Sequence, residues 1–289
     1  MQSLDPKAEA GTTRQLDEME KAQTERYRVI RCEKRICQEG HHELIQEEPL
    51  LIRVDDRPYS VVMRTPGEEI AHAAGFCLGE GLVDDRGDFA AVGYCEDLDP
   101  NVVDVTLKPE RREQVPDILE RRGFISQTSC GICGKELIKD LYQILRPVDD
   151  DMGLTIDEVL SCLEKLSETQ AYYSRTRGSH SAMVLDPRLK LLSFAEDVGR
   201  HNALDKAIGK VLLSGHLGDA RVCVLSSRVS YELVQKSARA RVPIILSKSR
   251  PTALAVEMGK ALNMTFACSG EESELIIFCG EDRIKRSNI

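Results

Sequence analysis

The sequence contains no tryptophan, and aromatic residues make up only 4% of its 289 residues. Aliphatic side chains must therefore supply most of any core. Hydrophobic residues reach 42% in total, a share typical of soluble globular proteins. Positive charge is also scarce, because the net charge is −9. Broad nucleic-acid binding is therefore not expected, since neutralising phosphates requires a basic face.

Long apolar runs are missing too. The first residues show no apolar segment of the signal-peptide type, and no later stretch approaches a membrane span. We therefore expect a cytoplasmic protein without a membrane partner. Residues 1–26 are polar and are expected to form a mobile leader. The ten cysteines, in a chain without a secretion signal, are expected to be thiols rather than disulfides.

The part of the chain over 27–122 is expected to form a small α+β subdomain. Short apolar segments predict strands over Leu51–Val54 and Ser60–Arg64. Two valines and a leucine alternate with other residues over 103–107, as in a half-buried strand. A charged surface helix is predicted over Pro109–Arg122 and would lead into the rest of the chain.

A helix start is predicted within this subdomain. Thr65 has the character of an N-cap residue, and it is followed by a proline and, three residues on, by Glu68. Cys77 falls on the apolar face of this helix, so we expect it to pack in the core. Gly79 and Gly81 indicate where the helix ends.

The part over 123–289 alternates strand and helix signals, which predicts an α/β sheet with parallel members. The predicted strands are Ser181–Leu185, Leu189–Phe194, Val222–Leu225, Val242–Leu246 and Glu274–Phe278, the first two joined as a hairpin by Asp186-Pro187-Arg188. The predicted helices are Asn202–Leu213, Ser230–Arg239 and Thr252–Leu262. The fold class is therefore α/β, with a mixed sheet flanked by helices.

The sharpest motif is the Cys-x-x-Cys pair in Thr128-Ser129-Cys130-Gly131-Ile132-Cys133-Gly134. Two glycines make its backbone pliable, and a helix is predicted to begin at Lys135. Cysteines ahead of a helix N-terminus feel its partial positive charge, which favours the thiolate. A thiolate attacks sulfane sulfur, and the second cysteine can resolve or shelter the product. Cys130 and Cys133 are therefore the candidate catalytic residues.

Four other interpretations of this pair stay open. One is a purely structural pair, although two flanking glycines are a poor choice for packing. A structural zinc site needs two more ligands, and Cys32 and Cys37, four residues apart, match a zinc motif poorly. A thioredoxin-like redox site would follow an early strand of a βαβ unit, which does not precede Cys130. A zinc deaminase could use His41-His42-Glu43, but Ser129 stands where that signature has proline. We therefore favour sulfur or redox chemistry and predict no resident metal.

Two loops in the second half have the composition of anion-binding sites. Strand Val222–Leu225 is followed by 226–230, and strand Val242–Leu246 by 247–252. Ligands of open α/β sheets collect at the carboxyl ends of strands, where helix N-termini favour phosphate. The candidate binding residues in these loops are Arg228, Ser230, Ser247, Lys248 and Ser249. The serines could instead cap two helices, but two such loops after consecutive strands favour a nucleotide-like ligand.

The run Glu196–Lys206 is also unusual, because it is rich in polar and charged residues and yet opens an apolar helix. Arg200 and His201 could donate hydrogen bonds to anionic groups of a ligand, while Asp197 or Asp205 could orient them. Local ion pairing at a charged helix start is the alternative. His180, ahead of a strand, is a weaker candidate.

These motifs, in this order, resemble the formate dehydrogenase accessory sulfurtransferase family, usually called FdhD/NarQ. The resemblance spans about 45–285. It rests on Glu48-Pro49-Leu50, Val62–Glu68, Gly75-Phe76 with Glu80-Gly81, Ser129–Gly134, Glu196–Lys206, Arg228–Glu232 and Ser247–Thr252.

The resemblance implies a cytidine-deaminase-like fold, a persulfide on Cys130 and an assisting Cys133. It implies that a cysteine desulfurase donates sulfur, and that the acceptor is the molybdenum bis-molybdopterin guanine dinucleotide cofactor of a formate dehydrogenase catalytic subunit. It also implies a homodimer. Cofactor binding by the last strand and its following loop would fall on Phe278, Cys279, Gly280, Glu281, Asp282 and Arg283.

Two other functions remain as alternatives at this stage. A non-catalytic chaperone for the molybdenum cofactor would use the same strand-end loops but would not need Cys130. A zinc-stabilised binding module would use the cysteines as ligands and would hold about one zinc ion per chain.

Overall fold

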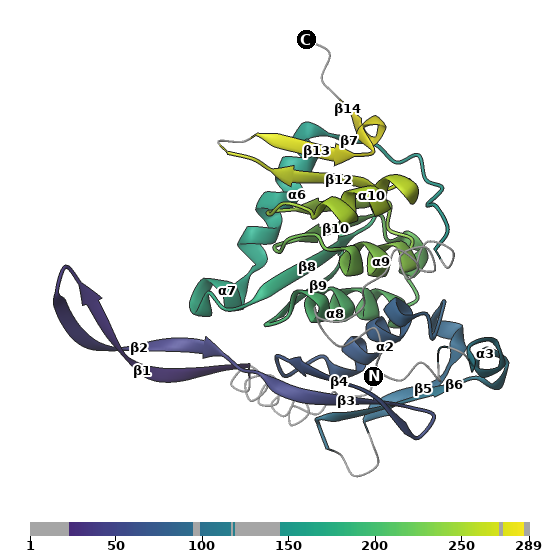
Figure 1. Ribbon diagram of the computed structural model, residues 1–289, viewed down its shortest axis with the longest axis horizontal. Helices are drawn as coiled ribbons and strands as arrows, with labels where there is room; N and C mark the ends of the chain where they lie inside the picture. Colours follow the sequence, from purple (N-terminus) through teal and green to yellow (C-terminus); the bar gives the residue numbers. More distant parts are fainter. Residues whose placement is uncertain (1–22, 95–98, 117, 119–144, 272–273, 286–289) are drawn as a thin grey trace, which may run out of the picture.

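The computed structural model describes residues 23–94, 99–116, 118, 145–271 and 274–285. These form two larger sheets, two two-stranded sheets and flanking helices (Figure 1). The strands of the first half are β1 (Thr24–Glu33), β2 (Ile36–Ile45), β3 (Glu48–Val54), β4 (Arg57–Arg64), β5 (Phe89–Tyr94) and β6 (Val102–Leu107). The helices of this half are α2 (Glu69–Glu80), η1 (Arg86–Asp88) and α3 (Pro109–Gln114).

The second half contains the larger sheet. The strands of this half are β7 (Leu154–Thr155), β8 (His180–Leu185), β9 (Leu191–Asp197), β10 (Val222–Leu225), β11 (Ile244–Ser247), β12 (Thr265–Ser269), β13 (Leu275–Cys279) and β14 (Ile284–Lys285). Of these, β7 and β14 pair only with each other within the described residues. The helices of this half are α6 (Ile156–Thr169), α7 (Ala171–Thr176), α8 (Arg200–Leu213), η2 (Leu217–Asp219), α9 (Tyr231–Arg239), α10 (Ala253–Ala261) and η3 (Glu281–Arg283).

The six-stranded sheet has the order β13-β12-β11-β10-β8-β9. Strands β10, β11 and β12 run parallel, whereas β8, β9 and β13 are paired antiparallel. Successive residues of these short apolar strands point to opposite faces. Side chains such as Cys223 pack toward α8, α9 and α10, and alternate ones such as Val222 pack toward α6. The predicted mixed α/β sheet flanked by helices is confirmed, while its cytidine-deaminase-like detail stays a prediction.

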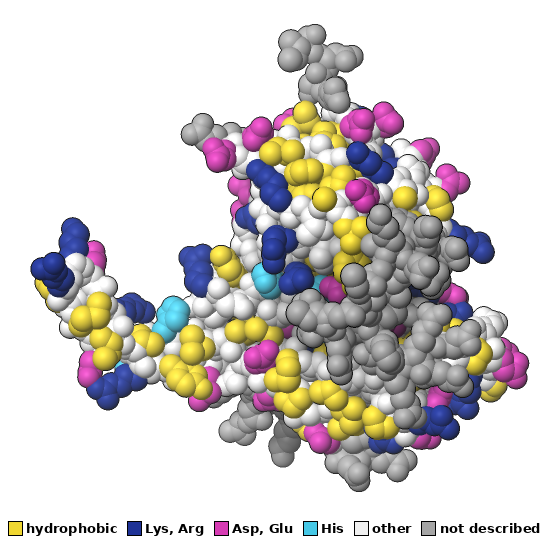
Figure 2. Space-filling model, viewed as in Figure 1, with side chains coloured by type: hydrophobic (Ala, Val, Ile, Leu, Met, Phe, Trp, Pro, Cys, Tyr) yellow, Lys and Arg dark blue, Asp and Glu magenta, His cyan; other side chains and the backbone are white. Residues whose placement is uncertain are grey.

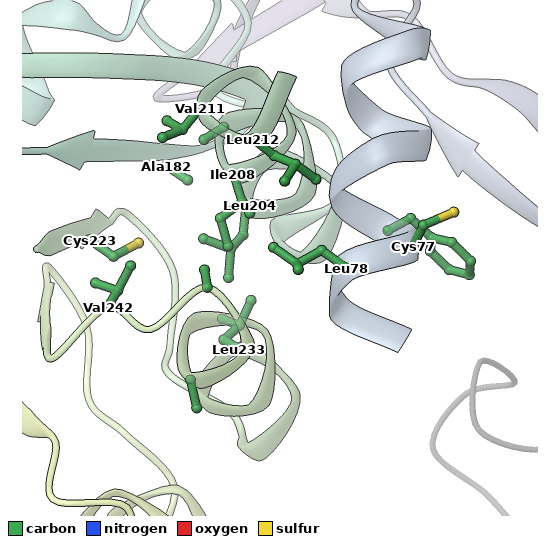
Figure 3. Packing of buried hydrophobic residues seen from close by; sticks show 14 of the residues in the cluster. Cys77, Leu78, Ala182, Leu204, Ile208, Val211, Leu212, Cys223, Leu233 and Val242 are labelled. Carbon is green, nitrogen blue, oxygen red and sulfur yellow. The ribbon is translucent and has the colours of Figure 1, made fainter. Parts of the chain in front are cut away.

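The four-stranded sheet, in the order β4-β3-β6-β5, is joined to the larger sheet through helix α2. Figure 3 shows Cys77 and Leu78 of α2 in the same packed cluster as Leu204 and Ile208 of α8. Cys77 is fully buried, as predicted. The predicted boundary near residue 122 lies outside the described residues, so the division into 27–122 and 123–289 stays a prediction.

Glycines let α2 and α8 approach each other very closely. A Cβ atom built on Gly75 would lie 1.9 Å from the carbonyl oxygen of Asp205, and one on Gly209 would lie 1.8 Å from that of Ala71. These distances leave no room for any side chain. The two glycines therefore fix how the first half of the chain sits on the second.

The predicted start of α2 is wrong. The helix begins at Glu69, and Glu68 precedes it in the left-handed region with φ 63° and no side-chain cap. Thr65 does not cap this helix, because its hydroxyl accepts a hydrogen bond from Val198 N at 3.0 Å and its N–H donates to Asp197 at 3.0 Å. A long-range contact thus replaces the local cap. The predicted end is confirmed, because Gly81 is the C-cap residue.

Two expectations about the first 45 residues are also wrong. Strand β1 begins at Thr24, inside the predicted leader, and pairs with β2 as a hairpin for which we predicted no strands. Cys32 and Cys37 are opposite each other in that hairpin and form a disulfide, although we expected thiols. Pairing of the two strands brings these cysteines within bonding distance. This does not require their spacing in the sequence to match a metal-binding motif.

Candidate functional site

One edge of the six-stranded sheet collects most of the candidate binding residues. Strands β10 and β11 end there, at Leu225 and Ser247, because they run parallel. Strand β8 begins at the same edge, since Ala182 pairs with Leu225, and β9 ends there, since His180 pairs with Asp197. The topology therefore brings the two strand-end loops and the start of α8 to the same edge of the sheet.

Basic side chains from two segments, the start of α8 and the loop after β10, lie near His180 at this edge. Burial lowers the pKa of His180, and the neighbouring charges of Arg200, His201 and Arg228 lower it further, against Asp197. Figure 2 shows histidine side chains beside Lys and Arg side chains on this part of the surface. The four residues His180, Arg200, His201 and Arg228 are called the basic cluster below.

Two members of the basic cluster are available to a ligand. Arg228 is exposed, and the buried Nε of Arg200 finds no hydrogen-bond acceptor among the described residues. A buried guanidinium N–H without an acceptor is costly unless another group pairs with it. A phosphate oxygen would supply such an acceptor, so the residues fit an anionic ligand.

His201 has a partner that the sequence did not indicate. Its Nε2 lies 2.5 Å from Oε2 of Glu232 in the first turn of α9, and both side chains are 31% exposed. The hydrogen bond from His201 lowers the pKa of the Glu232 carboxyl, against the effect of its burial. The hydroxyl of Ser230 lies 3.5 Å from the same Nε2 and does not cap α9. We predicted Asp197 or Asp205 in the orienting role, and Glu232 makes the contact instead.

Asp197 connects the two halves of the chain. Its buried carboxylate accepts hydrogen bonds from Thr65 N at 3.0 Å, Gly199 N at 2.8 Å and Asn202 Nδ2 at 2.9 Å. It also pairs with Lys206 Nζ at 2.8 Å, and that ammonium donates to the carbonyl of Thr65 at 2.7 Å. All lone pairs of the carboxylate are thus occupied by protein groups. Asp197 therefore builds the turn that presents Arg200 and His201.

Asp205 has a structural partner as well. It pairs with Lys236 of α9 at 2.9 Å, and both side chains are buried beneath the site. Lys236 Nζ also lies 5.4 Å from the ring centroid of Phe76 in α2. This pair joins α8, α9 and α2 below the basic cluster.

The loop after β11 is more enclosed than we expected. Ser247 is fully buried, donates to the carbonyl of Ser227 at 2.6 Å and accepts from Ser249 N at 3.0 Å. Lys248 is exposed and its ammonium contacts the hydroxyl of Ser167 in α6. Helix α10 is capped by Thr252, which accepts from Ala255 N at 3.2 Å. Ser247 therefore shapes the loop, while Lys248 and the half-buried Ser249 border the site.

The last predicted segment does not join the others. Strand β13 runs antiparallel to β12, and Cys279 pairs with Phe266, near the start of β12. The residues Phe278, Cys279, Gly280, Glu281, Asp282 and Arg283 therefore lie at the opposite edge of the sheet from the basic cluster. Arg283 donates to the carbonyls of Asp150 and Asn263 at 2.7 and 2.9 Å, which occupies its guanidinium.

Cys130 and Cys133 lie outside the described residues. Five other cysteines are described as free thiols, and all are buried: Cys77, Cys162, Cys223, Cys268 and Cys279. Burial raises the pKa of Cys162 and Cys279 to about 11, and that of Cys223 and Cys268 to about 12. None of these five is accessible as a thiolate at neutral pH.

Across the described ranges, no group of three or more His, Cys, Asp or Glu side chains is arranged to hold a metal ion. No helix in that part of the chain is both long and apolar enough to cross a membrane.

The fold and this edge define a mixed α/β protein with a cluster of basic side chains at the carboxyl ends of two of its parallel strands. The model of the FdhD/NarQ family matches residues 45–285, and the chain belongs to that family. The sulfur carrier protein FdhD of Streptomyces coelicolor is 35% identical over 271 residues, covering 90% of this chain and 95% of that protein. The protein of the same name from Mycobacterium tuberculosis is 34% identical over 253 residues, covering 83% and 91%.

A solved structure supports the fold. The crystal structure of a candidate formate dehydrogenase accessory protein from Desulfotalea psychrophila superposes with a TM-score of 0.72 and 21% sequence identity. It covers 91% of this chain and 99% of that one.

Proposed function

We propose that this chain is a sulfurtransferase that carries persulfide sulfur to the molybdenum cofactor of a formate dehydrogenase. Family membership and the sulfur-carrier relatives that match most of the chain support this role. The Cys-x-x-Cys loop, with Cys130 and Cys133, supplies the chemistry that the role requires. The described free thiols are all buried, so none of them competes for an external sulfur donor.

The transfer takes place in two steps. The Cys130 thiolate attacks the terminal sulfur of a persulfide on a cysteine desulfurase, and the thiolate of the desulfurase leaves. Cys130 then carries a persulfide, which Cys133 assists. In the second step the persulfide anion gives up one neutral sulfur atom to the molybdenum of the substrate cofactor, and the Cys130 thiolate remains.

The basic cluster holds the substrate cofactor in this proposal. The guanine dinucleotide groups of bis-molybdopterin guanine dinucleotide carry phosphates, and Arg200 and Arg228 offer guanidinium groups without a described carboxylate partner. The hydroxyl of Ser230 and the imidazole of His201 lie beside them. Lys248 and Ser249 extend the site along the next loop. The segment Phe278–Arg283, at the opposite edge, does not reach this site within one chain.

The setting of the reaction is also proposed. A cysteine desulfurase and the catalytic subunit of a formate dehydrogenase are the partners, the compartment is the cytoplasm, and the chain works as a homodimer with a cytidine-deaminase-like arrangement.

Activation of a formate dehydrogenase by Cys130 variants tests this function. Cys130→Ala should abolish activation while leaving the protein folded, because no other described thiol is exposed. Cys162→Ala, which removes a buried thiol in α6, is the control and should activate normally. Full activation by Cys130→Ala would instead favour a non-catalytic cofactor chaperone. One zinc ion per purified chain would favour a zinc-stabilised binding module.

A further inference from the structure

The hairpin formed by β1 and β2, called the arm below, extends away from the two sheets (Figure 1). Its base contacts α7, where Arg175 lies 3.5 Å from Glu43. From Ile30 to Glu39 every residue is exposed, and β1 and β2 pair only with each other within the described residues. An isolated two-stranded hairpin is marginally stable in water. The distal half of the arm therefore depends on local interactions.

The cross-strand disulfide is the strongest of these interactions. Cys32 and Cys37 face each other next to the turn, and both are exposed. The five described free thiols are, by contrast, all buried. The arm precedes nearly all of the segment that the family model matches, which begins at residue 45. Its cysteine pair thus lies outside the matched segment, whereas Cys130 lies within it.

The turn next to the disulfide is strained. Glu33 pairs with Ile36, so Lys34 and Arg35 form a two-residue loop, and their φ angles are 43° and 76°. Two-residue hairpin loops of this kind prefer Asn-Gly, because residues with a larger side chain rarely adopt positive φ. The sequence of the turn therefore opposes its conformation. The disulfide holds the two strands together directly beside it.

Three cations border the cysteine pair. Arg31, Lys34 and Arg35 lie within three residues of Cys32 along the chain, all three are exposed, and they outnumber the one carboxylate of that stretch, Glu33. Nearby cations stabilise a thiolate leaving group, which favours exchange with an attacking thiol. Exposure, strain and charge thus all favour reaction at this disulfide.

We propose that Cys32–Cys37 is a thiol–disulfide exchange site whose reductant is a low-molecular-weight thiol, and that its reduction opens the tip of the arm. One thiolate attacks a sulfur of the disulfide, forms a mixed disulfide and expels the other cysteine as a thiolate. A second thiolate attacks the mixed disulfide, which frees the first cysteine and gives the oxidised small-molecule disulfide. The two reductant thiols supply both electrons, and their protons pass to the cysteine thiolates or to water.

Glutathione titration of the full-length folded protein tests the exchange. After a millimolar glutathione treatment and a quench with N-ethylmaleimide, peptide mapping should find maleimide on both Cys32 and Cys37. The buried Cys77 and Cys223 serve as internal controls and should remain unmodified. If maleimide reaches Cys32 and Cys37 only under conditions that also expose Cys77 and Cys223, the site does not exchange in the folded protein and the proposal fails.

Limited trypsin digestion tests the opening of the tip. Cleavage after Arg31 should become about tenfold faster on reduction, because local opening exposes the backbone to the protease. The variant Cys32→Ser with Cys37→Ser should be cleaved at that fast rate with or without glutathione. Because the arm lies outside both sheets, this variant should fold, and a native circular dichroism spectrum verifies that it does.

A turn variant separates strain from cross-linking. Lys34→Asn with Arg35→Gly keeps both cysteines and gives the turn residues that tolerate positive φ. Its reduced form should be cleaved after Arg31 more slowly than the reduced wild-type protein. Equal cleavage rates for oxidised and reduced wild-type protein would overturn the proposed opening of the tip.

Discussion

His201 and Glu232 join the start of α8 to the first turn of α9, with Nε2 of the imidazole 2.5 Å from Oε2 of the carboxylate. The contact holds the imidazole beside Arg200 and the hydroxyl of Ser230. It places one carboxylate at the edge of an otherwise basic cluster. The orientation of His201 therefore depends on a residue from a different helix.

Stability below neutral pH should report on this contact. The folded-state pKa of Glu232 is lowered from its ordinary value of 4.5, so its contribution is present above pH 4.5 and is lost as pH falls through the lowered pKa. Glu232→Gln should remove about 0.5–1 kcal/mol of unfolding free energy near neutral pH and less in acid. Urea unfolding across this pH range measures the difference. Glu257→Gln, an exposed control on α10, should leave the profile unchanged.

Guanine nucleotide binding should depend on the exposed member of the basic cluster. Arg228→Ala should weaken the binding of GDP about tenfold or more, because a charge-assisted hydrogen bond to phosphate is worth roughly 1.5–3 kcal/mol. Arg188 is also exposed but lies in the β8–β9 turn at the opposite edge of the sheet. Arg188→Ala should therefore bind GDP normally. Isothermal titration calorimetry distinguishes the two variants, and equal affinities would place the nucleotide elsewhere.

The buried pair of Asp197 and Lys206 should matter most for stability. Asp197→Ala leaves a buried ammonium and three N–H donors without their acceptor, which should cost about 3–5 kcal/mol. Asp219 pairs with His216 on the surface, where both side chains are 60% exposed. Asp219→Ala should cost less than about 0.5 kcal/mol. Chemical denaturation gives both values, and similar costs would argue against a connecting role for Asp197.

The close approach of α2 and α8 should tolerate no added methyl group. Gly75→Ala would place a Cβ 1.9 Å from the Asp205 carbonyl, so the helices must separate at a cost of about 3 kcal/mol or more. A Cβ on Gly218 would meet no atom within 4 Å. Gly218→Ala should therefore change the melting temperature little. A melting temperature of Gly75→Ala equal to that of the wild-type protein would contradict the packing described for these helices.

The sequence predicted five strands of the larger sheet and three helices beside it, because short apolar strands and amphipathic helices leave a local signature. It did not predict β12, α6 or α7. Val222–Leu225 was located to the residue. Glu232 was not predicted as a partner of His201, because the two residues are 31 positions apart in the sequence and belong to different helices. Thr65 failed as a predicted helix cap for the same reason, because Asp197, 132 residues away, binds it instead.

The arm was not predicted from the sequence. Its strands carry many charged residues and lack a clear alternation, because neither face is buried. The cysteine pair could have indicated it, since residues at 32 and 37 flank a four-residue segment that can turn. We expected thiols instead, because the sequence shows no secretion signal and disulfides are typical of secreted proteins. The position of Phe278–Arg283 was missed because antiparallel pairing of β13 cannot be deduced from local pattern.

Mass spectrometry after incubation with a cysteine desulfurase and cysteine tests the proposed sulfur transfer most directly. The peptide containing Cys130 and Cys133 should gain the mass of one sulfur atom, localised to Cys130, and reduction should remove it. Cys130→Ala should show no gain on that peptide. An unmodified wild-type peptide, or an equal gain in Cys130→Ala, would show that this chain does not carry sulfur on Cys130.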